Sequence, residues 1–317
     1  MSYRKIIGFG DSSFVVSLPK EWVVKNGLKK GDNVLLDGSE GNIIKISPIF
    51  VKQNGGSGGI KINFEDDIKK LKSEILYAYV NSFNPITIVG KDINNKINSI
   101  NDVVKNFMYL EIVDHVSTDK IVLNTSINLD DISVYDILRR IDRTVISMVE
   151  DVKDYLSGKT IKISLGFNHK EENINKLCNL VFKILKLGFN PGNRTLLKIS
   201  INDIFYYWEL ALFLEKTANQ LKRIPRYPKP PISPELLTIL DKVFAQYQDA
   251  MKSNFTKDHQ LAISVFATKK SVYDKIDQLS SKLPRDATVI AHKMGMINTF
   301  SGNIAMAFLR LGMEINN

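Results

Sequence analysis

Apolar side chains recur every three or four residues in the second half of the chain, which is the spacing of one face of an α-helix. The first such segment follows Asp130 and Asp131, either of which can cap a helix, and it stops at Gly158. Its apolar face consists of Ile132, Tyr135, Leu138, Ile141, Val145, Met148, Val152 and Tyr155. Five more helices are predicted, at residues 170–187, 200–223, 234–254, 258–282 and 285–311.

Breaks in this pattern divide the six predicted helices into two groups of three. Glycine and proline interrupt the pattern at residues 188–193 and 225–231 and at Pro284. The layout predicts an internal duplication and two three-helix bundles, at residues 129–226 and 232–313. This inference rests on the layout, because the two halves share little sequence.

Short apolar runs bounded by glycine and proline occupy the start of the chain. A strand at residues 14–18 leads into Pro19, which suits the first turn of a helix, and Gly27 ends that helix after about two turns. Gly31 and Asp32 then form a turn into a second strand.

Residues 61–128 contain apolar patterns with the period of a helix and others with the period of a strand. These patterns predict a small α/β connector. Its two helices and about three strands are expected at residues 66–81, 85–90, 93–107, 109–116 and 120–124. The glycines and serine at residues 55–59 indicate a flexible linker, placed at residues 52–60, which ends a first domain at residues 1–51.

Composition narrows the class of protein. The chain has 317 residues, of which 44% are hydrophobic, so we expect several folded domains. No apolar run reaches the roughly 18–20 residues of a membrane span, and no secretory signal is visible. Cys178 is the single cysteine, which excludes an internal disulfide and a multi-cysteine metal site. We expect a buried structural thiol in a cytoplasmic protein without membrane insertion.

Positive charge is concentrated near the N-terminus of a chain whose net charge is +9. The basic residues of the first thirty positions are Arg4, Lys5, Lys20, Lys25, Lys29 and Lys30, against Asp11 and Glu21. Such an excess suits a polyanionic partner, because Lys and Arg neutralise phosphates. A solvated basic surface explains the charge by itself equally well.

Several spaced residues of this segment resemble the SpoVT/AbrB family of DNA-binding domains. The matching residues are Arg4-Lys5 on the first strand, Ser17-Leu18-Pro19-Lys20-Glu21 at the helix entry, Leu28, and Lys30-Gly31-Asp32 at the second turn. The resemblance covers residues 1–48. It implies half of a swapped-hairpin β-barrel, completed in an intertwined homodimer that binds double-stranded DNA. The expected DNA-binding residues are Arg4, Lys5, Lys20 and Lys25, which would contact phosphates, and Ser12 and Ser13 in the loop.

The helical half resembles the PhoU family of phosphate-uptake regulators, in its archaeal form with an AbrB-type domain in front. The similar patches are residues 109–113, 120–123, 133–134, 139–151 and 214–221. The resemblance implies a bundle that senses phosphate status, directly or through a phosphate transporter or signalling protein. The expected fold class is therefore multidomain α+β: the dimeric β-barrel half, the α/β connector and an all-α PhoU-like pair of three-helix bundles.

PhoU relatives can bind divalent or iron cations through carboxylates one helical turn apart, and this chain departs from that pattern. Glu215 is followed four residues later by Asn219, and residues 295–299 of the last helix carry no carboxylate. Glu150 and Asp154 keep the spacing that places two carboxylates on one face. Glu150, Asp154 and Glu215 are the candidate metal ligands, although a solvated charged face explains the first two as well.

Catalytic patterns are missing from the sequence. The four histidines are scattered singly, no Gly-x-Ser-x-Gly motif occurs, and the aromatic run at residues 206–208 suits a helical core better than a base-stacking platform. We expect no enzyme. The leading hypothesis is a DNA-binding transcriptional regulator of phosphate uptake and homeostasis. The alternative is an adaptor that docks on a phosphate transporter or sensor kinase and uses its AbrB-like domain only for dimerisation.

Overall fold

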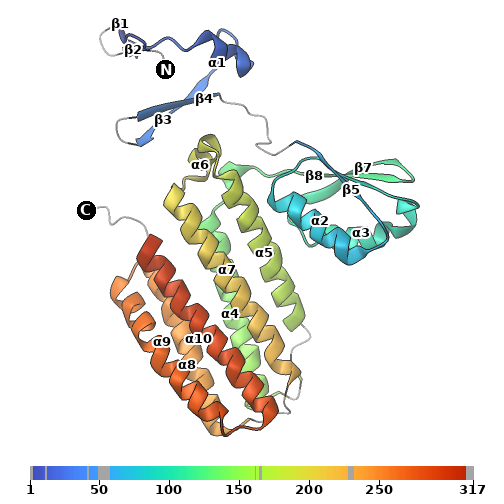
Figure 1. Cartoon of the computed structure of the whole chain (residues 1–317), viewed down its shortest axis with the longest axis vertical. Coiled ribbons are helices and arrows are strands. Elements are labelled where there is room, and N and C mark those ends of the chain that lie inside the picture. Colours follow the sequence, from blue (N-terminus) through green and yellow to red (C-terminus); the bar gives the residue numbers. More distant parts are fainter. Residues whose placement is uncertain are drawn as a thin grey trace. The chain divides into compact units, whose positions relative to one another are not determined.

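The chain forms two compact units, Met1–Lys52 and Gln53–Asn317, here named the N-terminal unit and the C-terminal unit (Figure 1). The computed structural model describes residues 3–10, 13–40, 43–48, 58–160, 162–163, 166–227 and 232–311. The predicted linker at residues 52–60 lies outside the described residues up to position 57, and Ile60 already belongs to a strand.

In the described part of the N-terminal unit, the chain forms two antiparallel strand pairs and one short helix. The elements are β1 (Ile7–Phe9), β2 (Ser13–Val15), α1 (Lys20–Lys25), β3 (Val34–Glu40) and β4 (Ile43–Pro48), with β1 paired to β2 and β3 to β4. The strand predicted at residues 14–18 is shorter, because the chain leaves the hairpin after Val15 to enter α1. Pro19 precedes α1 instead of lying in its first turn, and Gly27, at φ +63°, follows its end as expected.

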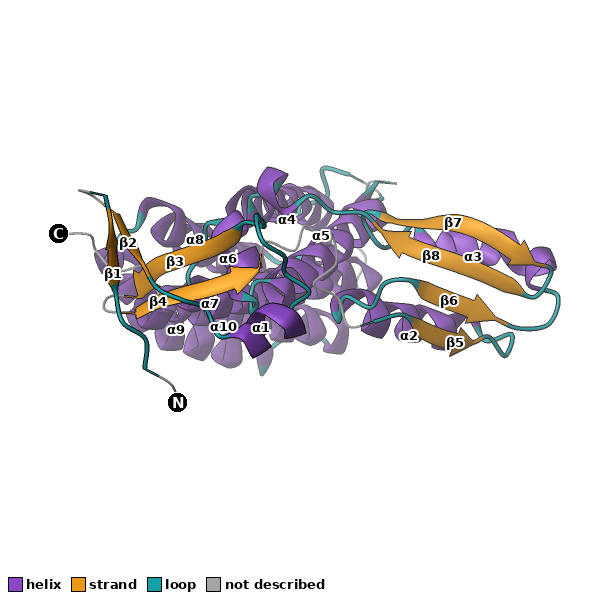
Figure 2. Ribbon diagram, turned by 90° about the horizontal axis from the view of Figure 1, so that it is seen from above, coloured by secondary structure: helices purple, strands orange, loops and turns teal. Residues whose placement is uncertain are grey.

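A four-stranded sheet with two helices on one face opens the C-terminal unit (Figure 2). Its strands are β5 (Ile60–Asn63), β6 (Ile86–Val89), β7 (Leu110–Ser117) and β8 (Lys120–Thr125), and its helices are α2 (Ile68–Val80) and α3 (Ile97–Val104). The order is β5-β6-β8-β7, with β5 and β6 parallel and the other pairs antiparallel. The prediction of about three strands missed β5, whose alternating pattern extends over only four residues.

Six long helices and one short helix follow among the described residues. They are α4 (Val134–Leu156), α5 (Phe167–Leu187), α6 (Pro191–Leu197), α7 (Ile201–Arg223), α8 (Pro234–Thr256), α9 (His259–Ser280) and α10 (Arg285–Leu311). The mostly helical character predicted for this part is confirmed. The short helix α6 falls in a predicted break. Asn190 caps it through its side-chain oxygen and Pro191 occupies its first turn, so these residues start a helix instead of only ending one.

The long helices pack as two groups of three that share one hydrophobic core. Helices α4, α5 and α7 contact one another, as do α8, α9 and α10, and the groups meet through α7 with α10 and α4 with α8. A single cluster of buried side chains runs through all six, and a second cluster lies between the sheet, α2 and α3. None of the helices in the described part of the chain combines the length and apolar character of a membrane span.

Local capping explains where α4 and α7 begin. Ser133 caps α4 by accepting a hydrogen bond from the Asp136 amide at 3.1 Å, whereas the predicted caps Asp130 and Asp131 lie in a preceding 3₁₀ turn. Ser200 and Asp203 form a reciprocal capping box at the start of α7. Both helices therefore start at a hydroxyl side chain that satisfies a free backbone amide.

Two glycines of α10 differ in the space available for the methyl group of an alanine. Replacing each of them with alanine therefore gives a matched pair of variants. A Cβ at Gly302 would overlap the aliphatic stem of Lys269 on α9, whereas a Cβ at Gly295 would reach Tyr273 at an ordinary 3.5 Å. We expect Gly295→Ala to stabilise the protein by up to ~1 kcal/mol through helix propensity. Gly302→Ala should be less stable than Gly295→Ala by about 1 kcal/mol, because the added methyl forces the Lys269 stem out of its contact. Urea unfolding of both variants measures the difference, and equal stabilities would contradict the close approach of α9 and α10.

Candidate nucleic-acid interface

The predicted phosphate-binding side chains of the N-terminal unit are all exposed. Arg4 and Lys5 lie before β1, not on the first strand as predicted, because the β1–β2 hairpin begins only at Ile7. Lys20 and Lys25 are the first and last residues of α1. None of these four side chains has an acidic partner among the described residues, so their charges are free to meet an anion.

Of the two predicted hydroxyl donors, Ser12 and Ser13, the structure describes one. Phe9 of β1 pairs with Ser13, and Gly10, directly after β1, adopts φ +69°. Ser13 is exposed at the start of β2. Ser12 lies outside the described residues.

A tight turn exposes two further basic side chains that were not among the predicted DNA-binding residues. The Lys29 amide donates to the Asp32 carboxylate at 2.6 Å, and the Asp32 amide donates to the Lys29 carbonyl at 3.1 Å. Gly31, at φ +98°, allows the backbone to reverse. Lys29 and Lys30 are both exposed. Two adjacent basic residues before a glycine turn are visible in the sequence, so they could have been included among the predicted phosphate contacts.

The N-terminal unit exposes a large apolar surface. No described side chain in it is buried, and neither hydrophobic core cluster includes any of its residues. Its exposed apolar residues are Tyr3, Ile6, Ile7, Phe9, Phe14, Val15, Val16, Val24, Leu36 and Ile44. An exposed apolar surface of this extent is typical of a protein interface.

The candidate metal ligands are dispersed. Glu150 is exposed, and Asp154 pairs with Lys159 at 3.0 Å. Glu215 lies on α7 near Glu171. The pKa of Glu215 is raised mainly by burial and secondly by the charge of Glu171. Within the described ranges, no group of three His, Cys, Asp or Glu side chains could hold a metal ion. The structure thus does not bring the three predicted ligands together.

A buried ion pair joins α5 to α7. The Lys222 ammonium lies 2.6 Å from the Glu171 carboxylate, and the Asn175 side chain donates to the other carboxylate oxygen at 2.9 Å. The Glu171 side chain is only 6% exposed, compared with 26% for Lys222. Lys222 therefore compensates a carboxylate that has almost no access to water.

A buried carboxyl–phenol pair joins the two groups of helices. The Tyr247 hydroxyl on α8 donates to the Asp142 carboxylate on α4 at 2.7 Å. Burial raises the pKa of Asp142 to about 6, although Tyr247, Arg139 and Arg143 favour the ionised form. The contact between the groups thus contains a titratable acid.

A buried lysine joins α5 to the α/β part of the C-terminal unit. The Lys183 ammonium donates to the Tyr79 carbonyl at 2.9 Å near the end of α2 and lies 4.7 Å from the centre of the Tyr79 ring. Burial lowers the pKa of Lys183 to about 8. Lys186 donates to the Asn81 side chain one turn further along α5.

Sequence reasoning missed these three buried ionic groups, although their positions carried a usable signal. Asp142 lies four residues after Leu138 and three before Val145, on the buried face of α4. Lys183 interrupts an apolar stripe on α5 in the same way. A charged residue at a core position of a helix predicts a buried partner.

Cys178 and the aromatic run of α7 lie where they were predicted. The Cys178 thiol is fully buried, and burial raises its pKa. Tyr206 and Tyr207 are buried in the helical core, and Trp208 packs against Phe182 with ring centres 4.7 Å apart. The expected structural roles of these residues are confirmed.

Comparison with known proteins identifies the N-terminal segment alone. A family model described as antidote-toxin recognition MazE, bacterial antitoxin, matches residues 9–56. No curated protein and no solved structure matches the chain. The chain therefore has an N-terminal MazE/AbrB-like domain, which confirms the AbrB-related part of the predicted resemblance. The PhoU resemblance of the helical part stays a prediction.

Proposed function

We propose that this protein is a transcriptional regulator of phosphate uptake, in which the MazE/AbrB-like domains of two chains form a dimer that binds double-stranded DNA. The observation that carries the proposal is the match at residues 9–56 together with the exposed basic side chains of the same unit, which have no acidic partner among the described residues. The protein acts by binding and not by catalysis.

Dimerisation is supported by the exposed apolar surface of the N-terminal unit. Phe14 is 78% exposed and Ile6 is 74% exposed in the single chain, and no side chain described in this unit is buried. A second copy supplies a complementary surface of the same kind, since a symmetric interface buries the same side chains twice. Domains of the matched type dimerise and bind DNA, which agrees with this arrangement.

DNA binding is assigned to the basic side chains around α1 and before β1. Arg4, Lys5, Lys20 and Lys25 neutralise phosphates, and Ser13 donates a hydrogen bond from the start of β2. Lys29 and Lys30 extend the same positive charge at the next turn. Phosphate contacts of this kind fix the position of the domain on the duplex and do not select a sequence.

The regulatory input is assigned to the helical part of the C-terminal unit. Its support is the PhoU resemblance and the layout of two groups of three helices. A phosphate-dependent ligand or partner on this part changes DNA affinity only if it prefers one arrangement of the paired chains. A direct test can decide whether the helical part responds to phosphate status.

The salt dependence of DNA binding tests the predicted contacts. In a dimer, the double variant Arg4→Ala/Lys20→Ala removes up to four phosphate contacts, which should reduce the slope of log affinity against log salt by roughly 3–4. The matched control is Lys105→Ala/Lys159→Ala, which removes the same charge from exposed positions of the C-terminal unit. Fluorescence anisotropy with duplex DNA measures both. An unchanged slope in the first variant would exclude those residues from the interface.

Selection of genomic DNA fragments tests the regulatory assignment. At near-physiological salt, the purified chain should enrich promoters of phosphate-transport genes, and the Arg4→Ala/Lys20→Ala variant should not. If the protein is a dimer but enriches no genomic DNA fragment, the proposed role as a transcriptional regulator is contradicted.

The adaptor is kept as a second candidate function because α9 exposes an apolar stripe. Ile263, Phe266 and Tyr273 on α9, and Met296 on α10, are each at least 40% exposed. An exposed apolar surface of this kind suits a protein partner. Loss of DNA selection with retained binding to a phosphate transporter or sensor kinase would favour the adaptor.

A further inference from the structure

The two edges of the four-stranded sheet differ in their suitability for pairing. The edge strand β7 contains two register irregularities, between Ile112 and Asp114 and between His115 and Ser117. Bulges of this kind discourage the addition of another strand. The opposite edge strand, β5, pairs with β6 without interruption from Ile60 to Asn63. Strand β5 is therefore the regular edge.

The outer side of β5 presents backbone groups that are open to pairing. The Ile60 amide donates to the Pro85 carbonyl at 3.0 Å, and the Phe64 amide donates to the Val89 carbonyl at 2.7 Å. Because alternate residues of a strand face opposite sides, the backbone groups of Lys61 and Asn63 point away from β6. No described residue hydrogen-bonds to them.

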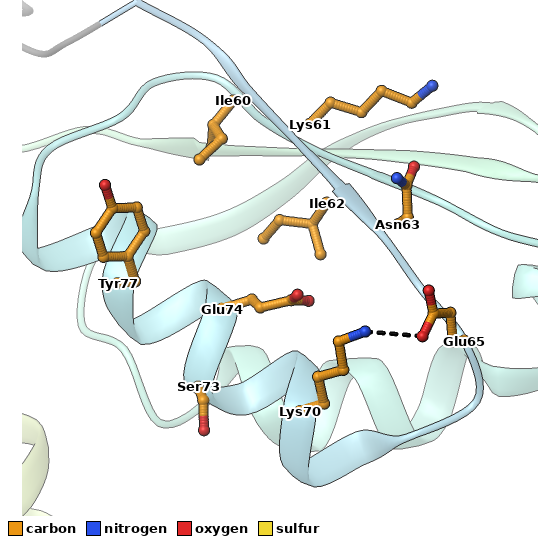
Figure 3. A pocket seen from close by; sticks show the side chains of 9 residues that line it. All are labelled: Ile60, Lys61, Ile62, Asn63, Glu65, Lys70, Ser73, Glu74 and Tyr77. Atoms are coloured by element: carbon orange, nitrogen blue, oxygen red, sulfur yellow. Dashed lines mark hydrogen bonds and ion pairs between the residues drawn. The ribbon is translucent and has the colours of Figure 1, made fainter.

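An open groove of about 470 Å³ lies beside this edge (Figure 3). Strand β5 forms one wall, and Lys70, Ser73, Glu74 and Tyr77, which recur on one face of α2, form the other. The Lys70–Glu65 ion pair, at 2.7 Å, closes one end, and Tyr77 stands at the other. Lys61 and Asn63 are exposed, and their side chains point away from α2.

We propose that β5 pairs with β5 of a second copy of this chain, antiparallel about a two-fold axis at Ile62, to make one sheet across both copies. This inference rests on the proposed dimer. Lys61 then faces Asn63 of the partner subunit, and these two pairs exchange four backbone hydrogen bonds. Both sheets keep their helices on the same face.

The residues of β5 favour this register over its neighbours. A two-fold axis at Lys61 would set two ammonium groups directly opposite each other, which is destabilising. An axis at Asn63 would need pairing at Glu65, which lies beyond the end of β5 at Asn63. The axis at Ile62 uses only strand residues and sets each lysine against an amide.

The connection to the N-terminal unit makes the second copy the natural occupant. Strand β4 ends at Pro48 and β5 begins at Ile60, so the chain between them spans at most about 40 Å. Once two N-terminal units have dimerised, the two β5 edges are held at a high effective concentration. Pairing of the edges joins the two C-terminal units directly, so an effector on the helices of one copy can act on the arrangement of both copies.

Cysteine cross-linking of the full chain tests the register. Lys61→Cys and Asn63→Cys chains, each with its own tag, are co-expressed, purified through both tags and oxidised. Positions 61 and 63 of opposed strands would lie about 5.5 Å apart between Cα atoms, within disulfide reach. Both side chains are exposed, and the native Cys178 is buried, so neither the fold nor the native thiol should interfere. Most of the mixed dimers should become covalent, and each variant alone should not.

Controls separate this proposal from the dimer on which it rests. In the control, co-expressed Glu111→Cys and Val113→Cys chains carry cysteines with the same two-residue offset on the edge strand β7. These chains should not form a disulfide. Light scattering gives the mass before oxidation. A monomeric mass would contradict both the proposed dimer and the β5 pairing. A dimeric mass without the disulfide between positions 61 and 63 would contradict the β5 pairing alone. Cross-linking of Lys61→Cys with itself, or of Asn63→Cys with itself, would overturn the register.

Discussion

Replacing Lys222 with methionine is expected to lower the free energy of unfolding by about 3–5 kcal/mol. The substitution keeps the aliphatic stem but removes the ammonium group that lies 2.6 Å from the Glu171 carboxylate. That carboxylate is 6% exposed, so water cannot replace the lost partner. Urea denaturation followed by circular dichroism measures the loss.

A double-mutant cycle shows whether the ion pair causes that loss. Glu171→Gln should cost less, because Lys222 is partly exposed and can remain hydrated. The double variant Glu171→Gln/Lys222→Met should recover most of the stability, since it leaves no unpaired charge. If the double variant were as unstable as Lys222→Met, the cost would come from packing and not from the unpaired carboxylate.

Replacing Asp142 with asparagine is expected to change how stability depends on pH. Burial raises the pKa of Asp142 to about 6, above its value in the unfolded chain, so the folded protein binds the extra proton between about pH 4 and pH 6. The contribution of Asp142 to stability is therefore greatest at low pH and falls as pH rises through this window, by up to about 3 kcal/mol. The introduced amide stays neutral and still accepts the Tyr247 hydrogen bond, so the Asp142→Asn variant should be the more stable protein at pH 7.5 and close to the natural chain at pH 4.

The matched control is Tyr247→Phe. It removes the hydrogen bond that favours the ionised carboxylate, so it should raise the pKa of Asp142 further and lower stability at pH 7.5 more than at pH 4. Urea unfolding of both variants at the two pH values provides the comparison. Parallel pH profiles for Asp142→Asn and the natural chain would show that Asp142 does not titrate in this window.

The three buried ionic groups share a position in the architecture. Glu171 and Lys222 join α5 to α7, Asp142 and Tyr247 join α4 to α8, and Lys183 joins α5 to the end of α2. The second and third thus lie at the boundaries of the first group of helices, with the second group and with the α/β part of the C-terminal unit, and the ion pair lies inside the first group. Polar contacts of this kind restrict how the elements can shift, which suits a unit proposed to transmit a signal to β5.

Local patterns in the sequence predicted much of the fold. The periodic apolar faces placed all six long helices within a few residues of their observed ends, because a 3.6-residue repeat is a property of each helix alone. The spaced residues from Arg4 to Asp32 likewise indicated an AbrB-related domain, which the family match supports. The strand β5 and the helix α6 were missed because four to seven residues carry too little periodic pattern.

The exposed basic side chains of the N-terminal unit could be anticipated, whereas the partners of the buried charged residues could not. The sequence by itself determined the helices, the basic N-terminal segment and its family resemblance, since these depend on neighbours along the chain. Only the tertiary structure decided that Glu171 meets Lys222, that Asp142 meets Tyr247, and that β5 is the regular edge of its sheet. The physical reason is that burial and pairing depend on which faces of distant elements pack together, and no local period specifies that choice.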